Sequence, residues 1–177
     1  MSALASQPTN LNYLSPLGFK FSVNRIAVFT HFVQTINIPD LIFGNIGLIT
    51  PFVKLPVPGD QIQFGELSVS FKVDEDMRAY TDIYDWMIGL GYPDNFDQYK
   101  TVASLKAPGA DSSSKGNYSD ATLTILSSAS NPIVDVVFYD IFPISLGGMT
   151  FDSRMATVDH LEASVTFAYK RFEVKRL

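Results

Sequence analysis

The fold of this chain is decided by residues 55–87, LPVPGDQIQFGELSVSFKVDEDMRAYTDIYDWM. The stretch begins with Pro and Gly residues that favour a turn, and it continues as a run of alternating apolar and polar residues. Because side chains alternate between the two faces of a β-strand, this run predicts a strand with one apolar face. The apolar face is expected to hold Leu67, Val69, Phe71 and Val73, and the polar face Glu66, Ser68, Ser70 and Lys72.

An amphipathic helix is predicted directly after this strand, over residues 74–90. Acidic residues at its start provide an N-cap and negative charge that complements the helix dipole. Apolar and aromatic residues then recur at helical spacing and predict the face that packs on the sheet. The acidic start is Asp74, Glu75 and Asp76, the packed face is Tyr80, Ile83, Tyr84 and Met87, and the exposed residues are Asp76, Arg78 and Asp82. We expect Trp86 to be a core residue.

Other strands are predicted on both sides of this unit. A first strand places Phe19, Phe21 and Val23 on one face and continues in kinked form through residues 29–38. Residues 121–126 and 133–141 form a predicted hairpin, and residues 161–172 alternate as a last strand. About six strands, one main helix and no βαβ alternation predict a mainly β fold. This fold is an antiparallel barrel or sandwich with one flanking α-helix.

We expect a single domain over residues 1–177, with three irregular segments. Residues 1–12 are a predicted flexible N-terminal arm, and residues 106–119 are a predicted flexible loop. Residues 38–58 are a predicted long apolar loop, because Pro and Gly residues interrupt any regular element there. Its large side chains either cover an open barrel mouth or form a surface that a neighbouring subunit completes. They include Leu41, Ile42, Phe43, Ile46 and Leu48.

Composition excludes several classes of protein. Thirteen basic and eighteen acidic residues give a net charge of −5, which argues against binding to nucleic acid or anionic lipid. The chain has no cysteine, so disulfides and thiolate metal sites are excluded. No signal peptide or membrane-spanning run is visible, and no membrane partner is expected.

Catalytic patterns are also missing from the sequence. His31 is interpreted as a strand or core histidine and His160 as an exposed one, and neither has metal-binding spacing. No nucleophile elbow is present, and Gly147-Gly148 is interpreted as a turn. Asp135 and Asp140 are expected to point to opposite faces of their strand, so they form no local pair. We therefore predict no catalytic, cofactor or metal residues and no enzymatic activity.

A carbohydrate-binding β-sandwich is the main alternative from another class. Its sugar platform would consist of Trp86 and nearby aromatic residues, if they were exposed. These are Tyr80, Tyr84, Tyr92, Phe96 and Tyr99. Helical spacing favours packing between helix and sheet instead.

A second block of sequence, residues 138–174, adds to what residues 55–87 indicate. It reads FYDIFPISLGGMTFDSRMATVDHLEASVTFAYKRFEV, a strand, a Pro-Gly corner, a turn and a closing strand. Together the two blocks resemble the tail tube proteins of contractile-tailed bacteriophages over residues 19–173. The positions that carry the resemblance are Gly59, Asp60, Phe64, Asp74, Glu75, Asp85, Trp86, Phe142 and Pro143.

The resemblance implies a structural virion protein of the phage tail, made in the host cytoplasm. Six subunits would form a ring, and stacked rings would form a tube inside the tail sheath. Tape-measure protein and DNA would pass through the lumen, and baseplate tube-initiator and tail terminator proteins would close the ends. The lumen-facing residues would be Ser68, Ser70, Ser164 and Thr166, and residues 38–58 would stack the rings. A specialised tube-end or baseplate ring and a type VI secretion-like tube protein are the alternatives.

Overall fold

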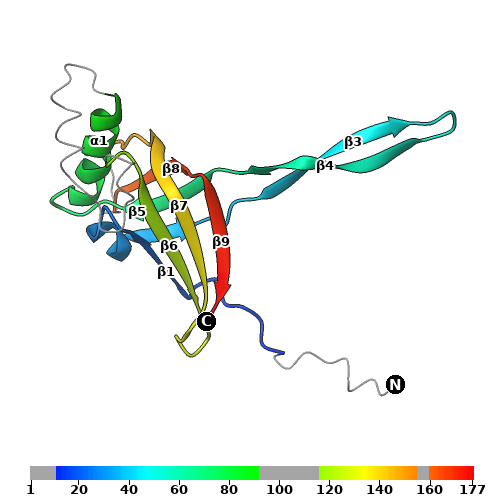
Figure 1. Ribbon diagram of the computed structural model, residues 1–177. Helices are drawn as coiled ribbons and strands as arrows, with labels where there is room; N and C mark the ends of the chain where they lie inside the picture. Colours follow the sequence, from blue (N-terminus) through cyan, green and yellow to red (C-terminus); the bar gives the residue numbers. More distant parts are fainter. Residues whose placement is uncertain (1–10, 92–115, 155–159) are drawn as a thin grey trace.

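The computed structural model describes residues 11–91, 116–154 and 160–177. Seven strands form an antiparallel sheet, which contains the path β1-β6-β7-β8-β5-β2 with β9 as a further partner of β7 (Figure 1). Two further strands, β3 and β4, pair only with each other and project far from the rest of the molecule (Figure 1). The strands are β1 (Phe19–Val23), β2 (Val33–Ile36), β3 (Leu41–Ile49), β4 (Lys54–Phe64), β5 (Leu67–Lys72), β6 (Ser119–Leu126), β7 (Pro132–Leu146), β8 (Glu162–Ala168) and β9 (Arg171–Arg176).

The long strand β7 belongs to both layers of the structure. Residues 132–141 pair with β6 and residues 134–139 pair with β9, whereas residues 142–146 pair with β8. The strand bends at Asp140, whose φ is 54° and whose N–H donates to Asp120 Oδ1 at 3.1 Å. We call β1, β6, β9 and residues 132–141 of β7 the first layer. The second layer is β2, β5, β8 and residues 142–146 of β7.

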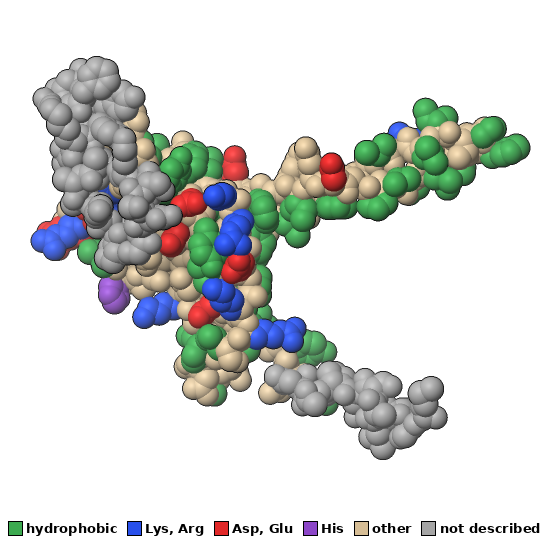
Figure 2. All heavy atoms as spheres, viewed as in Figure 1, with side chains coloured by type: hydrophobic (Ala, Val, Ile, Leu, Met, Phe, Trp, Pro, Cys, Tyr) green, Lys and Arg blue, Asp and Glu red, His purple; other side chains and the backbone are tan. Residues whose placement is uncertain are grey.

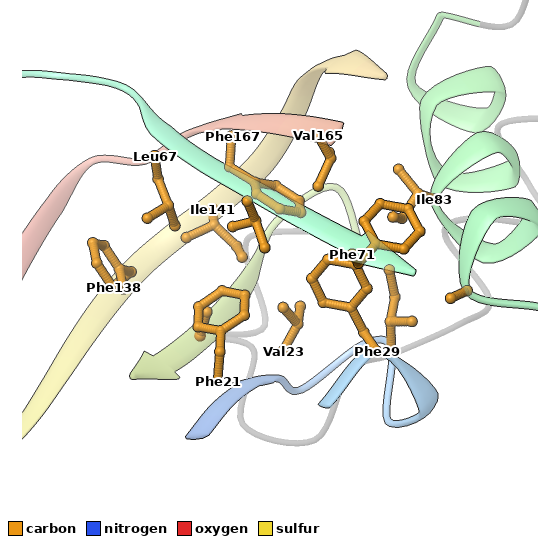
Figure 3. Close-up of a cluster of buried hydrophobic side chains, with 14 of the residues drawn as sticks. Phe21, Val23, Phe29, Leu67, Phe71, Ile83, Phe138, Ile141, Val165 and Phe167 are labelled. Carbon is orange, nitrogen blue, oxygen red and sulfur yellow. The ribbon is translucent and has the colours of Figure 1, made fainter. Parts of the chain in front are cut away.

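The hydrophobic core lies between these layers. Figure 3 shows Phe21 and Phe138 of the first layer pointing toward Leu67, Phe71 and Phe167 of the second. Phe29 lies edge-on to Phe71, with ring centroids 4.9 Å apart, and it is fully buried. Phe29 comes from a short 3-10 helix, η2 (Val28–His31), which carries the chain from the first layer to the second. The prediction that β1 continues through residues 29–38 is therefore wrong, because β1 and β2 lie in different layers.

The helix α1 (Arg78–Gly91) packs against the core but begins later than predicted. Asp74 is the capping residue, because its carboxylate accepts hydrogen bonds from the N–H groups of Arg78 at 3.2 Å and Ala79 at 3.3 Å. Met77 has a φ of 54°, so the chain turns between Asp74 and the helix instead of entering it directly. The buried face is Ala79, Ile83, Trp86 and Gly89, with Tyr80, Met87 and Leu90 half-buried.

Two side chains of the helix test the predicted burial pattern. Trp86 is 1% exposed, which confirms it as a core residue and excludes its ring from an exposed sugar platform. Tyr84 is 50% exposed, so its predicted packing on the sheet is wrong. Asp76, Arg78 and Asp82 are exposed, as predicted.

Asp74→Ala is expected to lower the free energy of unfolding by about 0.5–2 kcal/mol, because two helix N–H groups lose their acceptor. Glu75→Ala is the matched control, since Glu75 is exposed and lies before the helix. Urea unfolding followed by circular dichroism measures both changes. Equal destabilisation by the two substitutions would contradict the capping role of Asp74.

The mainly antiparallel β class with one flanking helix is confirmed, although the described residues contain nine strands instead of about six. The predicted hairpin over residues 121–141 is present as β6 and β7. The predicted last strand is divided into β8 and β9, which pair with successive parts of β7 on either side of its bend. Tyr92, Phe96, Tyr99 and residues 1–10 and 106–115 lie outside the described residues.

Candidate assembly surface

Residues 38–58 do not form the irregular loop that the sequence predicted. They contribute to a long antiparallel hairpin, in which β3 pairs with β4 from Leu41↔Phe64 to Ile49↔Lys54. Pro56 and Pro58 are tolerated because residues two apart in a strand direct their N–H groups to the same side. In a two-stranded ribbon that side can be the open edge, where no partner needs an N–H. The presence of proline therefore did not exclude a strand here.

The backbones of the two hairpin strands lie very close together where Gly44 meets Gly59. A Cβ atom on Gly59 would lie 2.7 Å from the carbonyl oxygen of Gly44, so the backbones are too close for a larger residue. The register also shifts between Phe43 and Asn45, where β4 has extra residues. Gly59 and Asp60 thus lie inside β4, and the turn expected at these residues is formed instead by residues 50–53.

Large apolar side chains are exposed along the whole hairpin (Figure 2). Leu48, for example, is 56% exposed, and its cross-strand partner Leu55 is also exposed. The five residues predicted to stack rings, Leu41, Ile42, Phe43, Ile46 and Leu48, all lie in β3 and are exposed. Four apolar partners in β4 extend this surface, and these are Leu55, Val57, Ile62 and Phe64. Ile62 and Phe64 lie beyond the segment 38–58 that was predicted to stack the rings. The described residues of a single subunit leave this apolar surface uncovered, which is typical of a protein interface.

The root of the hairpin is fixed to the sheet by an aromatic cluster. The Phe64 ring contacts the rings of Tyr169 and Phe172, with centroids 6.0 Å and 5.6 Å away. Phe138 lies beneath, 5.3 Å from Tyr169. Burial, with a contribution from the charge of Asp40, raises the pKa of Tyr169 to about 12. Phe64, part of the motif identified in the sequence, therefore joins the hairpin to the strands at the bend between β8 and β9.

Small polar side chains form a second surface, on the outer face of the second layer. Ser68 lies opposite Thr166, and Ser70 lies opposite Ser164 in the β5–β8 register. The row extends to Thr35 beside Ser70 and to Ser145 beside Thr166. The structure thus brings the four residues predicted to line a lumen onto one patch, and their assignment to a lumen stays a prediction.

The edges of this layer are open in the described subunit. β2 pairs only with β5, and residues 142–146 of β7 pair only with β8. Open strand edges present unpaired backbone groups that can pair with another chain. Phe142 is half-buried against Tyr118, with ring centroids 5.7 Å apart, and Pro143 is buried.

The remaining motif residues have structural positions. Trp86 donates from Nε1 to the carbonyl oxygen of Asn117 at 3.1 Å, and the Arg25 guanidinium lies 4.9 Å from the centre of its ring. Burial lowers the pKa of Arg25. Asp85 and Glu75 are exposed, and burial together with the charge of Asp85 raises the pKa of Asp82.

Within the described part of the chain, no group of three or more His, Asp or Glu side chains is arranged to hold a metal ion. His160 is exposed as predicted, but His31 is exposed in η2 and is not the core histidine that the sequence suggested. Among the helices that the structure describes, none is both long enough and apolar enough to cross a membrane. The expectation that the protein is not an enzyme stays a prediction.

Comparison with known proteins finds the same fold in solved structures from contractile injection systems. No family model and no curated protein matches the sequence significantly. Among solved structures, the chain is similar to one from the anti-feeding prophage cap, described as a tube terminating cap. The TM-score is 0.66 and the identity 14%, over 100% of both chains. The chain has the tail tube fold.

Two further solved structures with this fold come from an extracellular contractile injection system. The one described as a sheath-tube complex gives a TM-score of 0.59 at 15% identity, over 97% of this chain and 100% of the other. The one described as a sheath/tube terminator gives a TM-score of 0.56 at 15% identity, over 94% of this chain and 99% of the other. The resemblance to tail tube proteins seen in the sequence is confirmed at the level of the tail tube fold.

Proposed function

We propose that this protein is a tube subunit of a contractile tail, assembling as sixfold rings that stack into the inner tube. The observation that carries the proposal is the hairpin of β3 and β4, whose apolar side chains beyond the root at Phe64 are exposed in the described subunit. A two-stranded ribbon is only marginally stable by itself, so its extended form suits a contact with another subunit. The ring-stacking residues are Leu41, Ile42, Phe43, Ile46 and Leu48.

The two open edges of the second layer support ring closure. Pairing of β2 with residues 142–146 of a neighbouring β7 would continue the sheet from subunit to subunit. A closed ring leaves no strand edge exposed. In that ring the patch of Ser68, Ser70, Ser164 and Thr166 faces the lumen. Small hydroxyl side chains and a net negative chain give DNA little to bind, which suits a conduit for DNA ejection.

The partners in this proposal are a sheath outside the tube, tape-measure protein and DNA within it, and initiator and terminator proteins at its ends. Solved structures with this fold come from a sheath-tube complex and from a terminator, which supports the sheath and the end proteins as partners. The protein would then be located in the phage tail or in a similar contractile particle.

A tube-end ring is the second candidate, favoured by the similarity over the full length of both chains to the tube terminating cap. Such a protein would form a single ring on which no further ring of the same protein stacks. The two roles therefore differ in whether the rings stack on one another.

Negative-stain electron microscopy of the purified protein tests both roles. We expect sixfold rings, and tubes that lengthen as protein concentration rises, because each ring presents hairpins to the next. Single rings at every concentration would favour the tube-end role. A stable monomer at high concentration, measured by analytical ultracentrifugation, would contradict both.

A further inference from the structure

The outer edges of the two layers differ in charge. In the second layer the edges are β2 and residues 142–146 of β7, and neither contains a charged residue. In the first layer the edges are β1 and β9, because among the described strands β1 pairs only with β6 and β9 only with β7. Four of the six residues of β9 are charged, and these are Arg171, Glu173, Lys175 and Arg176.

Tyr139 of β7 holds three of these charges in place on the outer face of the first layer. Its hydroxyl donates to Glu173 Oε2 at 3.0 Å and accepts a hydrogen bond from Lys175 Nζ at 3.3 Å. The Arg171 guanidinium lies 4.4 Å from the centre of the Tyr139 ring and also pairs with Glu173. The hydrogen bond with Tyr139 lowers the pKa of Glu173 and raises the pKa of Lys175. Both groups therefore stay ionised beside the edge, and Figure 2 shows acidic and basic side chains gathered along this face.

Arg176 carries the fourth charge of β9, and it lies on the inner face of the layer. It is opposite Val134 of β7, on the strand face that also carries Phe172 and Val174. A strand added beside β9 would extend this inner face and would have to cover the guanidinium. Because a charge taken out of water without a partner is costly, an inward-directed charge on an edge strand opposes pairing.

The edge of β5 is closed in a different way where β2 ends. The side chain of Asn37 accepts a hydrogen bond from the Ser68 N–H at 2.6 Å and donates to the Glu66 carbonyl oxygen at 3.2 Å. The side-chain amide thus takes the place of a backbone partner. These two backbone groups of β5 are already bonded, so the edge left open on this side of the second layer is β2 itself.

We propose that the charged residues of β9 prevent this edge from pairing with a strand of another copy. Subunits are then joined only through the uncharged edges, β2 and residues 142–146 of β7. This inference rests on the proposed function and adds the residues that select which edges join. An uncharged β9 would offer a competing row of backbone hydrogen bonds, and pairing there leads to irregular aggregates instead of rings.

A fourfold threonine variant of β9 tests this selection. Threonine is uncharged and favours strands, so the change removes the charges but keeps a sequence that is compatible with a strand. Three positive charges and one negative charge are lost, which takes the net charge from −5 to −7. A larger net charge keeps proteins apart, so a new association would come from the edge and not from lower solubility. The substitutions are Arg171→Thr, Glu173→Thr, Lys175→Thr and Arg176→Thr.

The matched control is Arg78→Thr combined with Arg154→Thr. Both residues are exposed, neither lies in a strand, and their loss also gives a net charge of −7. Thioflavin T fluorescence, the pelleted fraction and negative-stain micrographs measure sheet aggregation. Thermal unfolding of the freshly purified monomer measures whether each variant is folded.

We expect the fourfold variant to place at least about fivefold more protein in thioflavin-positive aggregates than either the control or the unmodified protein. Rings or tubes formed by the fourfold variant without added aggregation would overturn the role of β9 and leave the proposed function intact. An unmodified protein that stays monomeric would overturn both.

A smaller change replaces the fourfold variant if that variant does not fold. Lys175→Thr with Arg176→Thr keeps the bond between Tyr139 and Glu173, and its own control is Lys175→Arg with Arg176→Lys, which retains both charges. Hydrogen exchange read by mass spectrometry then locates the new contact. Slower exchange at residues 171–176 in the aggregates would assign the contact to β9, and unchanged exchange there would overturn the proposal.

Discussion

Replacing Ile42 and Phe43 with serine is expected to stop polymerisation while leaving the subunit folded. Both side chains are about half exposed in the hairpin, so their loss removes little from the core. Each would contribute roughly 1 kcal/mol when a neighbour covers its exposed half, taken from about 1.5–3 kcal/mol for full burial. The minimum concentration for polymerisation should therefore rise at least about 30-fold, since 1.4 kcal/mol corresponds to a factor of about ten.

The matched control for this variant is the substitution of both Gln61 and Gln63 with serine. These residues belong to β4 and are exposed, and Gln63 is the cross-strand partner of Ile42. Light scattering during polymerisation and thermal unfolding of the monomer measure the two effects separately. Normal polymerisation of the Ile42/Phe43 variant, or a subunit that no longer folds, would refute the assembly role of the hairpin.

Trp86→Ala is expected to lower the free energy of unfolding by about 3–5 kcal/mol, the usual cost of removing a large buried aromatic side chain. The indole is 1% exposed, and its ring centroid lies 6.4 Å from that of Phe167 in β8. The substitution also removes the hydrogen bond to Asn117 and uncovers the half-buried Arg25 guanidinium. Urea unfolding of the monomer measures the change.

Tyr84→Ala is the control on the same helix, because Tyr84 is 50% exposed. It should change the free energy of unfolding by less than about 1 kcal/mol. A decrease in the free energy of unfolding as large as that caused by Trp86→Ala would mean that the helix as a whole is sensitive to side-chain truncation. In that case the core position of Trp86 would not explain its effect.

The alternation of apolar and polar residues was sufficient to predict the core-facing residues of β1, β5 and β8, because each strand has one face on the core. It did not predict where β1 and β8 end. The same alternation placed Ser68 and Ser70 on the polar face of their predicted strand, and the pairing of β5 with β8 brings them beside Ser164 and Thr166. Periodicity was less reliable on the helix. Tyr84 and Trp86 both fit a helical pattern, and only the three-dimensional packing shows that the second one is buried.

The hairpin was misjudged because its strands have no buried face in the described subunit. Apolar side chains lie on both faces of the ribbon, so no two-residue period marks it in the sequence. Pro56 and Pro58 then favoured a loop, although an open ribbon edge accepts them. The contacts of Phe64 with Tyr169 and Phe172, which fix the root of the hairpin, join residues far apart in the chain, and local patterns do not contain them.

The shared strand β7 has a mechanical consequence. Many sandwiches hold their two sheets together by side-chain packing, and such sheets can slide over each other under load. Here a continuous backbone passes from one layer to the other at Asp140, held by Asp120 on one side and, on the other, by the Lys170 N–H bonded to the Tyr139 carbonyl. A force that reaches the second layer is therefore transmitted along covalent bonds to the first. Shear between the layers requires the hydrogen bonds at this bend to break, and these bonds therefore stiffen the subunit against shear.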